Sequence, residues 1–212
     1  MDDIKEMENK IAYNKFNVID MPKLQSPFKR VTNEQGRYVV TPEIDPDYAW
    51  VFTDPEVQAV EKLDGTNVSI LINDAKVKRI FNRTAELDFF CGSPIIECLL
   101  HSAEKNYLPK EDGQWFGEAI GEKIQSNPLK IKQRLWIPFT RAIHTLSYHS
   151  WHKYPKTFDN ISSWFKNYLF SLAHKKYAEK DTKIMAEGIV FTSLNQPFKM
   201  CKLRRNMFDW YT

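Results

Sequence analysis

The sequence predicts an α+β fold in which short strands outnumber helices. Short runs rich in β-branched and aromatic residues recur along the 212-residue chain, among them the apolar run 68–72 and the partly basic run 76–81, and runs of this kind are typical of strands. Two longer stretches, 94–108 and 158–180, instead repeat apolar residues at the spacing of a helix. The chain is long enough for one substantial core. No domain boundary is visible, so we expect one domain over residues 1–212.

The charge balance neither requires nor excludes a nucleic-acid partner. Lys and Arg total 30 against 27 Asp and Glu, a formal net charge of +3. The basic residues gather at four places: 76–79, 130–134, 174–176 and 202–205. Each cluster alone is most simply a solvated face, whereas together they permit a groove that follows a phosphate backbone.

The sequence carries no sign of a membrane partner. Its acidic start, Met1 to Glu6, lacks the apolar core of a signal peptide. No run approaches the roughly 18 apolar residues that a membrane helix needs. The cysteines are odd in number and widely spaced, at Cys91, Cys98 and Cys201, which suits reduced thiols. We therefore expect a cytoplasmic protein.

The first fifty residues are expected to be rich in loops. Prolines interrupt this part of the chain four times, at Pro22, Pro27, Pro42 and Pro46. Short strands are predicted between them at 28–31 and 38–40.

The stretch 61–67, Glu61-Lys62-Leu63-Asp64-Gly65-Thr66-Asn67, holds a lysine, an acid and a glycine at close spacing. Strands are predicted on both sides of it, and Asp-Gly is typical of the tight turn of a hairpin. Lys62 would then lie at a strand end, with the N–H groups of Gly65 and Thr66 free to approach a phosphate. A lysine amine attacks only in its neutral form, which burial or nearby cations favour. The alternative is an ordinary hairpin with a solvated lysine.

The next predicted strand, 76–81, ends in Asn82-Arg83-Thr84. Arg83 at a strand end could bind a phosphate through two hydrogen bonds from its guanidinium group, or it could be a surface arginine. Ser93 followed by Pro94 indicates the start of the first helix, which we expect to run to about Leu108.

Two predicted strands each carry one acid among apolar residues. Glu118 lies in the strand 114–120 and Glu187 in the strand 184–191. A carboxylate is rarely buried without a partner, and a divalent metal is one candidate partner for Glu187. The alternative for Glu118 is an edge-strand glutamate that faces water.

The remaining segments supply aromatic and basic residues. A strand is predicted at 135–139, where Pro138 indicates a sheet edge or a bulge and the aromatics could stack on a base or pack in the core. The helix 158–180 presents an apolar stripe that we interpret as core. The last strand, 198–204, carries Lys202.

Lys62, Arg83, Glu118, Glu187 and Lys202, each on or ending a strand and in this order, form a set more specific than any member. This set resembles the covalent nucleotidyltransferases, which comprise ATP-dependent DNA and RNA ligases and mRNA capping enzymes. Lys62-Leu63-Asp64-Gly65 is similar to their nucleophile motif, Phe116-Gly117-Glu118 to the third, Glu187-Gly188-Ile189-Val190 to the fourth, and Met200-Cys201-Lys202 to the fifth. Within the superfamily, Gly65-Thr66-Asn67, Asn82-Arg83-Thr84 and Ile124 to Pro128 resemble the RNA ligase 2-like group.

The resemblance implies an adenylyltransferase domain, related to the ATP-grasp fold, with antiparallel sheets, flanking helices and the nucleotide in a cleft between the sheets. It implies that Lys62 attacks the α-phosphate of ATP and carries AMP, and that Lys202 neutralises the transition state. Glu187 would position Mg²⁺ or Mn²⁺. The remaining nucleotide-binding residues implied are Glu61, Asp64, Gly65, Asn67, Arg83, Glu118 and Phe139, with Glu118 on the ribose and Phe139, or else Trp136, stacked on the adenine.

The sequence departs from the family pattern in three ways. Many members have histidine where Asp64 stands, so this motif leans toward the DNA-ligase and capping form. Met200 occupies the position of a lysine, which Lys199, Arg204 or Arg205 could replace, although neighbouring strand positions face opposite ways. No C-terminal accessory domain is expected after residue 212, and a partner protein or domain could replace it.

The expected function is therefore that of an ATP-dependent RNA ligase. It would transfer AMP from Lys62 to a 5′-phosphate end and seal that end to a 3′-hydroxyl, with RNA the favoured nucleic acid. The alternatives are a minimal ATP-dependent DNA ligase, a capping guanylyltransferase on weaker grounds, and a catalytically weak module that binds nucleic-acid ends.

Overall fold

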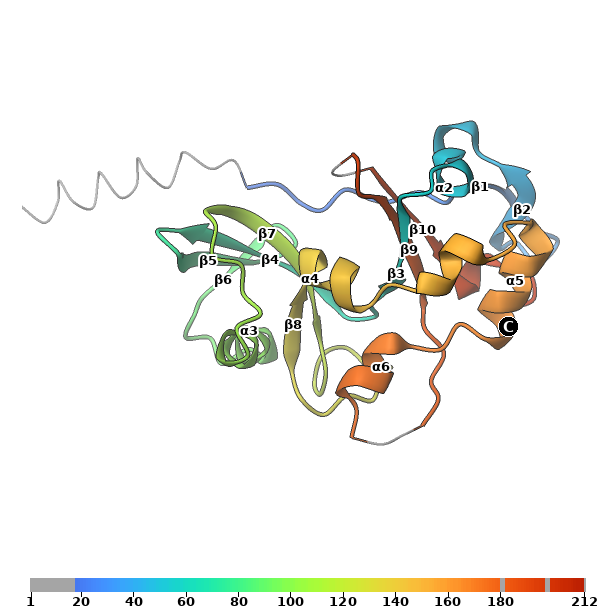
Figure 1. Cartoon of the computed structure of the whole chain (residues 1–212). Helices are drawn as coiled ribbons and strands as arrows, with labels where there is room; N and C mark the ends of the chain where they lie inside the picture. Colours follow the sequence, from blue (N-terminus) through green and yellow to red (C-terminus); the bar gives the residue numbers. More distant parts are fainter. Residues whose placement is uncertain (1–17, 180–181, 197–198, 212) are drawn as a thin grey trace, which may run out of the picture.

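The computed structural model describes residues 18–179, 182–196 and 199–211, and it confirms an α+β fold with antiparallel sheets (Figure 1). The described strands form sheets of five, three and two strands. Two predicted boundaries lie outside the described residues: Lys180, the predicted end of the last helix, and Phe198, the predicted start of the last strand. Within the described part of the chain, no helix has the length and apolarity that crossing a bilayer requires.

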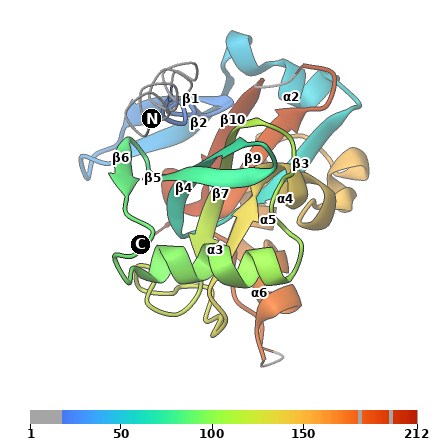
Figure 2. The ribbon, with the colours of Figure 1, turned by 90° about the vertical axis from the view of Figure 1, so that its left-hand side faces the viewer.

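The five-stranded sheet has the order β6-β5-β4-β7-β8. Its strands are β4 (Thr66–Asn73), β5 (Lys76–Asn82), β6 (Ala85–Leu87), β7 (Gly113–Ile120) and β8 (Leu135–Pro138). Val68, Ile70 and Ile72 alternate along β4 and pack with Ile95 and Leu99 of helix α3 (Pro94–Glu104), because alternate strand residues share a face. Figure 2 shows α3 lying across this sheet. The other face of the sheet is left for the site described below.

The three-stranded sheet has the order β10-β9-β3 and packs on an aromatic core. Its strands are β3 (Val57–Lys62), β9 (Gly188–Ser193) and β10 (Met200–Arg204). Trp151, in the 3-10 helix η2 (His149–Lys153), lies 4.8 Å between ring centroids from Phe191. It stacks at 6.2 Å on Trp164 of helix α5 (Phe158–Asn167). This packing holds one face of the sheet, so β3 presents Lys62 from a rigid support.

The predicted hairpin around Asp64-Gly65 is wrong. β3 and β4 do not pair; they belong to different sheets, and residues 63–65 carry the chain from one to the other. Gly65 makes this crossing possible because a Cβ at this position would lie 2.1 Å from the carbonyl oxygen of Ala119 in β7. Lys62 therefore lies where the two sheets meet rather than at the tip of a hairpin.

The predicted helix 158–180 is two helices, α5 and α6 (Leu172–Tyr177). Between them the backbone is extended and bonds to the segment before β9: Ser171 N–H donates to Ile184 O at 2.7 Å, and Ala186 N–H to Leu169 O at 2.8 Å. These tertiary hydrogen bonds outweigh the helical pattern of the sequence. Tyr168 belongs to the apolar stripe that was predicted to lie in the core, but it is 65% exposed.

Several predicted boundaries are also corrected. The strand 135–139 ends at Pro138, at the sheet edge as expected, and Phe139 instead begins an unpredicted helix, α4 (Phe139–Thr145). The helix from Ser93, which caps it as predicted, ends at Glu104 rather than near Leu108. Glu187 precedes β9 instead of lying within it.

The N-terminal third contains the two short strands predicted there, β1 (Phe28–Thr32) and β2 (Tyr38–Ile44), paired with each other. The remaining short helices are η1 (Pro46–Tyr48), α2 (Trp50–Thr53) and η3 (Arg205–Met207). Phe28 and Phe208 both enter the aromatic core, so this part packs against the three-stranded sheet.

Ser102 joins α3 to the edge strand β8. Its buried hydroxyl donates to Trp136 O and accepts from Trp136 N–H, both at 2.9 Å. We expect Ser102→Ala to lower the free energy of unfolding by about 1–3 kcal/mol, because both partners lose a buried hydrogen bond. Urea unfolding beside the exposed control Ser163→Ala measures this, and equal stabilities of the two variants would contradict it.

Candidate active site

A cavity of about 240 Å³ is lined by both larger sheets, by α4 and by residues 21–24. Beyond residues 21–24, its apolar lining is Val60, Leu63, Phe139, Ala142, Ile143, Val190 and Met200. Its charged and amide-bearing lining is Lys23, Glu61, Lys62, Asn67, Arg83, Glu118 and Lys202. Seven of the residues named in the sequence analysis thus line one cavity, although they come from distant parts of the chain. They are Glu61, Lys62, Asn67, Arg83, Glu118, Phe139 and Lys202. Apolar walls beside several cations suit a ligand that has a flat apolar part and an anionic part.

Lys62, which lines this cavity, forms an ion pair with Glu187. Lys62 Nζ lies 2.5 Å from Glu187 Oε2, and the two side chains are only 23% and 19% exposed. The pair forms because Lys62 ends β3 directly opposite Gly188, the first residue of β9, which places Glu187 beside it. The amine is therefore held inside the cavity by a carboxylate and does not point into bulk solvent.

Arg204 is the second cation on Glu187, with Nη1 3.6 Å from Oε1. Met200, Lys202 and Arg204 alternate along β10 with the buried Cys201 and Leu203, so the first three share the face that looks toward the site. Lys199 instead lies over the ring of Trp50, and Arg205 donates to Phe165 O. Of the three replacements considered for the missing lysine at position 200, Arg204 is the one brought to the site.

Glu118 lies in the same charged cluster. The pKa of Glu118 is raised to about 7, chiefly by burial; the charge of Lys62 and the Gly65 backbone oppose the rise, and the charge of Glu187 adds to it. Burial also lowers the pKa of Lys202, with Arg204 and Lys62 acting in the same direction. In both groups burial disfavours the charged form, and shifted pKa values of this kind are typical of functional sites.

Asn67 has an unused acceptor in the cavity wall. Its Oδ1 is buried and has no hydrogen-bond partner among the described residues, and such a group is rare in a folded core unless a ligand or water completes it. Across the turn from it, Gln125 Nε2 donates to Gly65 O. The stretch 124–128 therefore holds the turn after Lys62 in place.

The carboxylate of Glu61 is bonded to helix α6. It accepts from Ser171 Oγ at 2.5 Å and from Ala173 N–H at 2.7 Å, and the residue is 2% exposed. A contact between Glu61 and a nucleotide would therefore have to come from its backbone. Burial raises the pKa of Glu61 to about 7, while the bonds from Ser171 and α6 oppose the rise.

This raised pKa predicts a pH dependence of stability. Between the ordinary value of 4.5 and about 7, folded Glu61 binds its proton more tightly than the unfolded chain does, so stability falls as pH rises through this window. We expect Glu61→Gln, which cannot ionise, to avoid up to about 3 kcal/mol of that loss. Urea unfolding of both proteins at pH 4.5 and pH 7.5 measures the difference in slope. Parallel pH profiles would contradict the prediction.

Phe139 and Trp136, the alternatives for stacking on a base, have different environments. Phe139 is half-buried and lines the cavity. Trp136 is fully buried, its indole N–H donates to Val68 O at 3.0 Å, and its ring packs where a Cβ on Gly117 would clash. The alternative that Trp136 stacks on the base is therefore wrong, and the stacking role of Phe139 stays a prediction.

Arg83 and Asp64 are placed less centrally. Arg83 follows β5 as predicted and lines the cavity, but its side chain is 69% exposed and reaches Asp20 only at 3.7 Å. Asp64 is half-buried, and neither it nor Gly65 is among the described residues that line the cavity.

Three parts of the chain were not assigned a role in the site from the sequence: residues 21–24, Gln125 and, as a definite choice, Arg204. Residues 21–24 close one side of the cavity and were expected only as loop. Gln125 was noted as part of a motif without a contact assigned to it. Arg204 could have been selected from strand alternation alone, since it is two residues from Lys202 and therefore on the same face.

No protein-family profile matches the chain, and a search of curated proteins finds no similar sequence. Solved structures share its fold. A variant of the Naegleria gruberi RNA ligase with ATP and Mn matches with a TM-score of 0.51 and 15% identity over 90% of this chain. A variant of that ligase without ligand (TM-score 0.51, 14% identity) and one with AMP and Mn (0.50, 15%) match over the same share. The chain spans 61–62% of the length of these ligases.

Proposed function

We propose that this protein is an ATP-dependent RNA ligase that acts through a covalent Lys62–AMP intermediate. The observation that carries the proposal is the cavity lined by Lys62, Glu118 and Lys202, together with the ion pair that Lys62 forms with Glu187. The shared fold supports it, because the Naegleria structures are of an RNA ligase with ATP or AMP. The 61–62% coverage of those ligases leaves room for a partner protein or domain in the complete reaction.

In the first step the neutral Nζ of Lys62 attacks the α-phosphorus of ATP. The N–P bond forms as the bond from that phosphorus to the bridging oxygen breaks, and pyrophosphate leaves with the electron pair. Glu187 Oε2, 2.5 Å from Nζ, is in place to take the amine proton. Lys202 and Arg204 supply positive charge around the reacting phosphate, where negative charge grows in the transition state.

The nucleotide is held by the rest of the cavity. Phe139 and the apolar residues of α4 and β9 would contain the adenine, Glu118 would accept a hydrogen bond from the ribose, and Asn67 and Arg83 would contact phosphates. The unused Oδ1 of Asn67 is an acceptor, so it fits a water molecule of a hydrated metal rather than a phosphate oxygen.

The residues present also fit Mg²⁺ or Mn²⁺ held mainly by water and phosphate. Among the described residues no three His, Cys, Asp or Glu side chains converge as a metal cage. Mg²⁺ commonly binds through one or two carboxylates together with substrate phosphates and water, and Glu187, with Asn67, offers such ligands here. When bound, the metal would neutralise phosphate charge.

In the later steps a 5′-phosphate end attacks the phosphorus of Lys62–AMP, and the amine leaves. A 3′-hydroxyl then attacks the activated 5′-phosphate, AMP leaves, and the strands are joined. The resemblance of the sequence to the RNA ligase 2-like group favours RNA as the substrate.

Incubation with α-labelled ATP or GTP and a divalent metal tests the proposal. Label attached to the protein from ATP, followed by transfer to a 5′-phosphorylated RNA strand, is the expected result. Label from GTP alone would favour capping, faster sealing of DNA would favour a DNA ligase, and no label from either nucleotide would leave a module that binds nucleic-acid ends.

A further inference from the structure

Residues 19–25, which we call the strap, cross from the five-stranded to the three-stranded sheet. At one end Ile19 exchanges two hydrogen bonds with the Gln114 side chain of β7, at 2.9 and 2.8 Å. At the other end Lys202 N–H of the edge strand β10 donates to Gln25 O at 2.7 Å. Figure 1 shows the strap passing above β7 and on to β10. Because both ends are tied to strands, the position of the strap over the site is fixed.

The middle of the strap forms one side of the cavity. Met21, Pro22, Lys23 and Leu24 all line it. Lys23 is exposed, whereas Lys62 is only 23% exposed, so Lys23 lies at the mouth and Lys62 deeper inside. The positive charge of Lys23 acts on Lys202, whose pKa it helps to lower, after the larger effects of burial, Arg204 and Lys62.

Lys23 makes no ion pair with any residue in the described part of the chain, whereas Lys62 and Arg204 share Glu187. Lys62, Lys202 and Arg83 also line the cavity, so the positive charges repel one another. An anion that reaches from the cavity to its mouth would relieve this repulsion and attract Lys23.

The proposed reaction supplies such an anion. Attack by Lys62 on the α-phosphorus requires the leaving group to lie roughly in line on the opposite side, and pyrophosphate must depart through the mouth. We propose that Lys23 of the strap binds the β- and γ-phosphates of ATP and neutralises the departing pyrophosphate. This inference rests on the proposed function and assigns a residue outside the motifs from which that function was derived.

The inference separates triphosphate from monophosphate binding. Lys23 would contact ATP and pyrophosphate, but it would not contact AMP, which has only the α-phosphate. We therefore expect Lys23→Gln, which keeps most of the side-chain stem, to weaken ATP binding about 10-fold and AMP binding less than about 2-fold. Lys23→Arg should restore most of the affinity for ATP.

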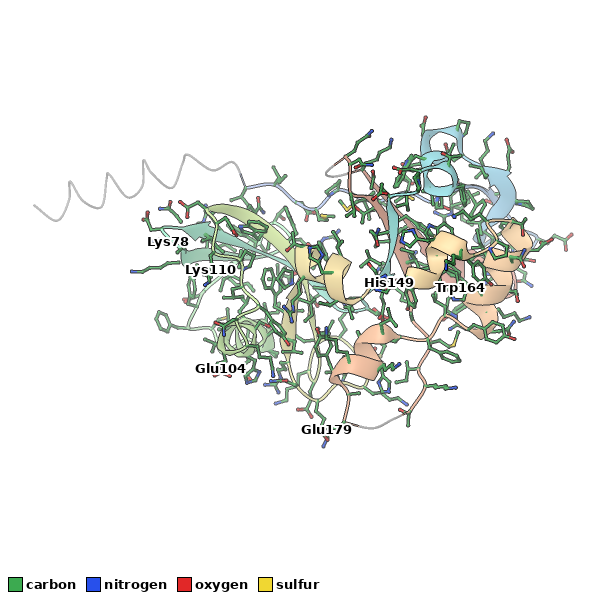
Figure 3. All side chains as sticks on the ribbon, in the orientation of Figure 1. Lys78, Glu104, Lys110, His149, Trp164 and Glu179 are labelled. Atoms are coloured by element: carbon green, nitrogen blue, oxygen red, sulfur yellow. The ribbon has the colours of Figure 1, made fainter. Side chains whose placement is uncertain are left out.

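Calorimetry measures these affinities in the Lys62→Ala background, in which ATP cannot be consumed. The matched control is Lys78→Gln, because Figure 3 places Lys78 at the end of the five-stranded sheet remote from β9 and β10. A second measurement starts from the labelled Lys62–AMP protein and adds pyrophosphate, which re-forms ATP. Lys23→Gln should need about 10-fold more pyrophosphate for half-maximal release of label.

The outcomes distinguish this inference from the proposed function. A wild-type protein that takes no label from ATP contradicts the proposed function itself. A wild-type protein that takes label, together with a Lys23→Gln variant that binds ATP and responds to pyrophosphate normally, overturns the role of Lys23 alone. Equal weakening of ATP and AMP also overturns it, because Lys23 would then only hold the strap in place.

Discussion

Lys62→Arg is expected to reduce covalent labelling from ATP at least about 1,000-fold, the largest effect predicted for this protein. Arginine keeps the positive charge and can still pair with Glu187, so the fold and the charge balance of the cavity should persist. A guanidinium does not lose its proton in proteins and therefore cannot attack phosphorus. Labelling with α-labelled ATP over a time course measures the loss.

The control for this variant is Lys78→Arg, the same substitution at the remote end of the five-stranded sheet (Figure 3). It should take label at the wild-type rate. Persistent label on Lys62→Arg would show that another residue carries the nucleotide, and the assignment of Lys62 as nucleophile would be wrong.

Glu187→Gln is expected to slow label formation about 100-fold or more, within the range of general acid–base catalysis. An amide cannot take the proton of Lys62, and it leaves Lys62 and Arg204 without their shared carboxylate. Part of the lost rate should return at higher pH, where hydroxide can remove the amine proton. Single-turnover labelling at saturating ATP, from pH 6 to pH 9, measures both effects.

The matched control is Glu104→Gln at the end of α3, which Figure 3 places apart from β9 and β10. Thermal unfolding checks that neither variant loses its fold. A Glu187→Gln protein that takes label at the wild-type rate would contradict the role of Glu187, whereas a slow rate at every pH would limit that role to phosphate or metal positioning.

Much of the local structure could be predicted from the sequence because local patterns determine it. Ser93-Pro94 caps and starts α3, the alternation in β4 places its apolar residues against that helix, and Pro138 confines β8 to a sheet edge. The failures share one cause. At Asp64-Gly65 and at Leu169 to Ser171, hydrogen bonds or close packing with distant strands replaced the locally favoured hairpin and helix.

The candidate site was predicted as a set of residues but not as an arrangement. Strand alternation alone puts Arg204 on the face of Lys202, yet its contact with Glu187 depends on the pairing of β9 with β10. Burial of the Glu61 carboxylate under α6 could not be inferred, because it requires the break between α5 and α6. Lys23 had no motif around it to distinguish it from other lysines.

The sequence by itself determined the α+β class, most of the strands, and the types and order of the charged residues, because side-chain chemistry and short-range periodicity are properties of neighbouring residues. The tertiary structure decided which of those charges meet. It brought Lys62 to Glu187 across 125 positions and laid the strap over Lys202. Distances between remote residues depend on sheet pairing and core packing, which are set by the whole chain at once.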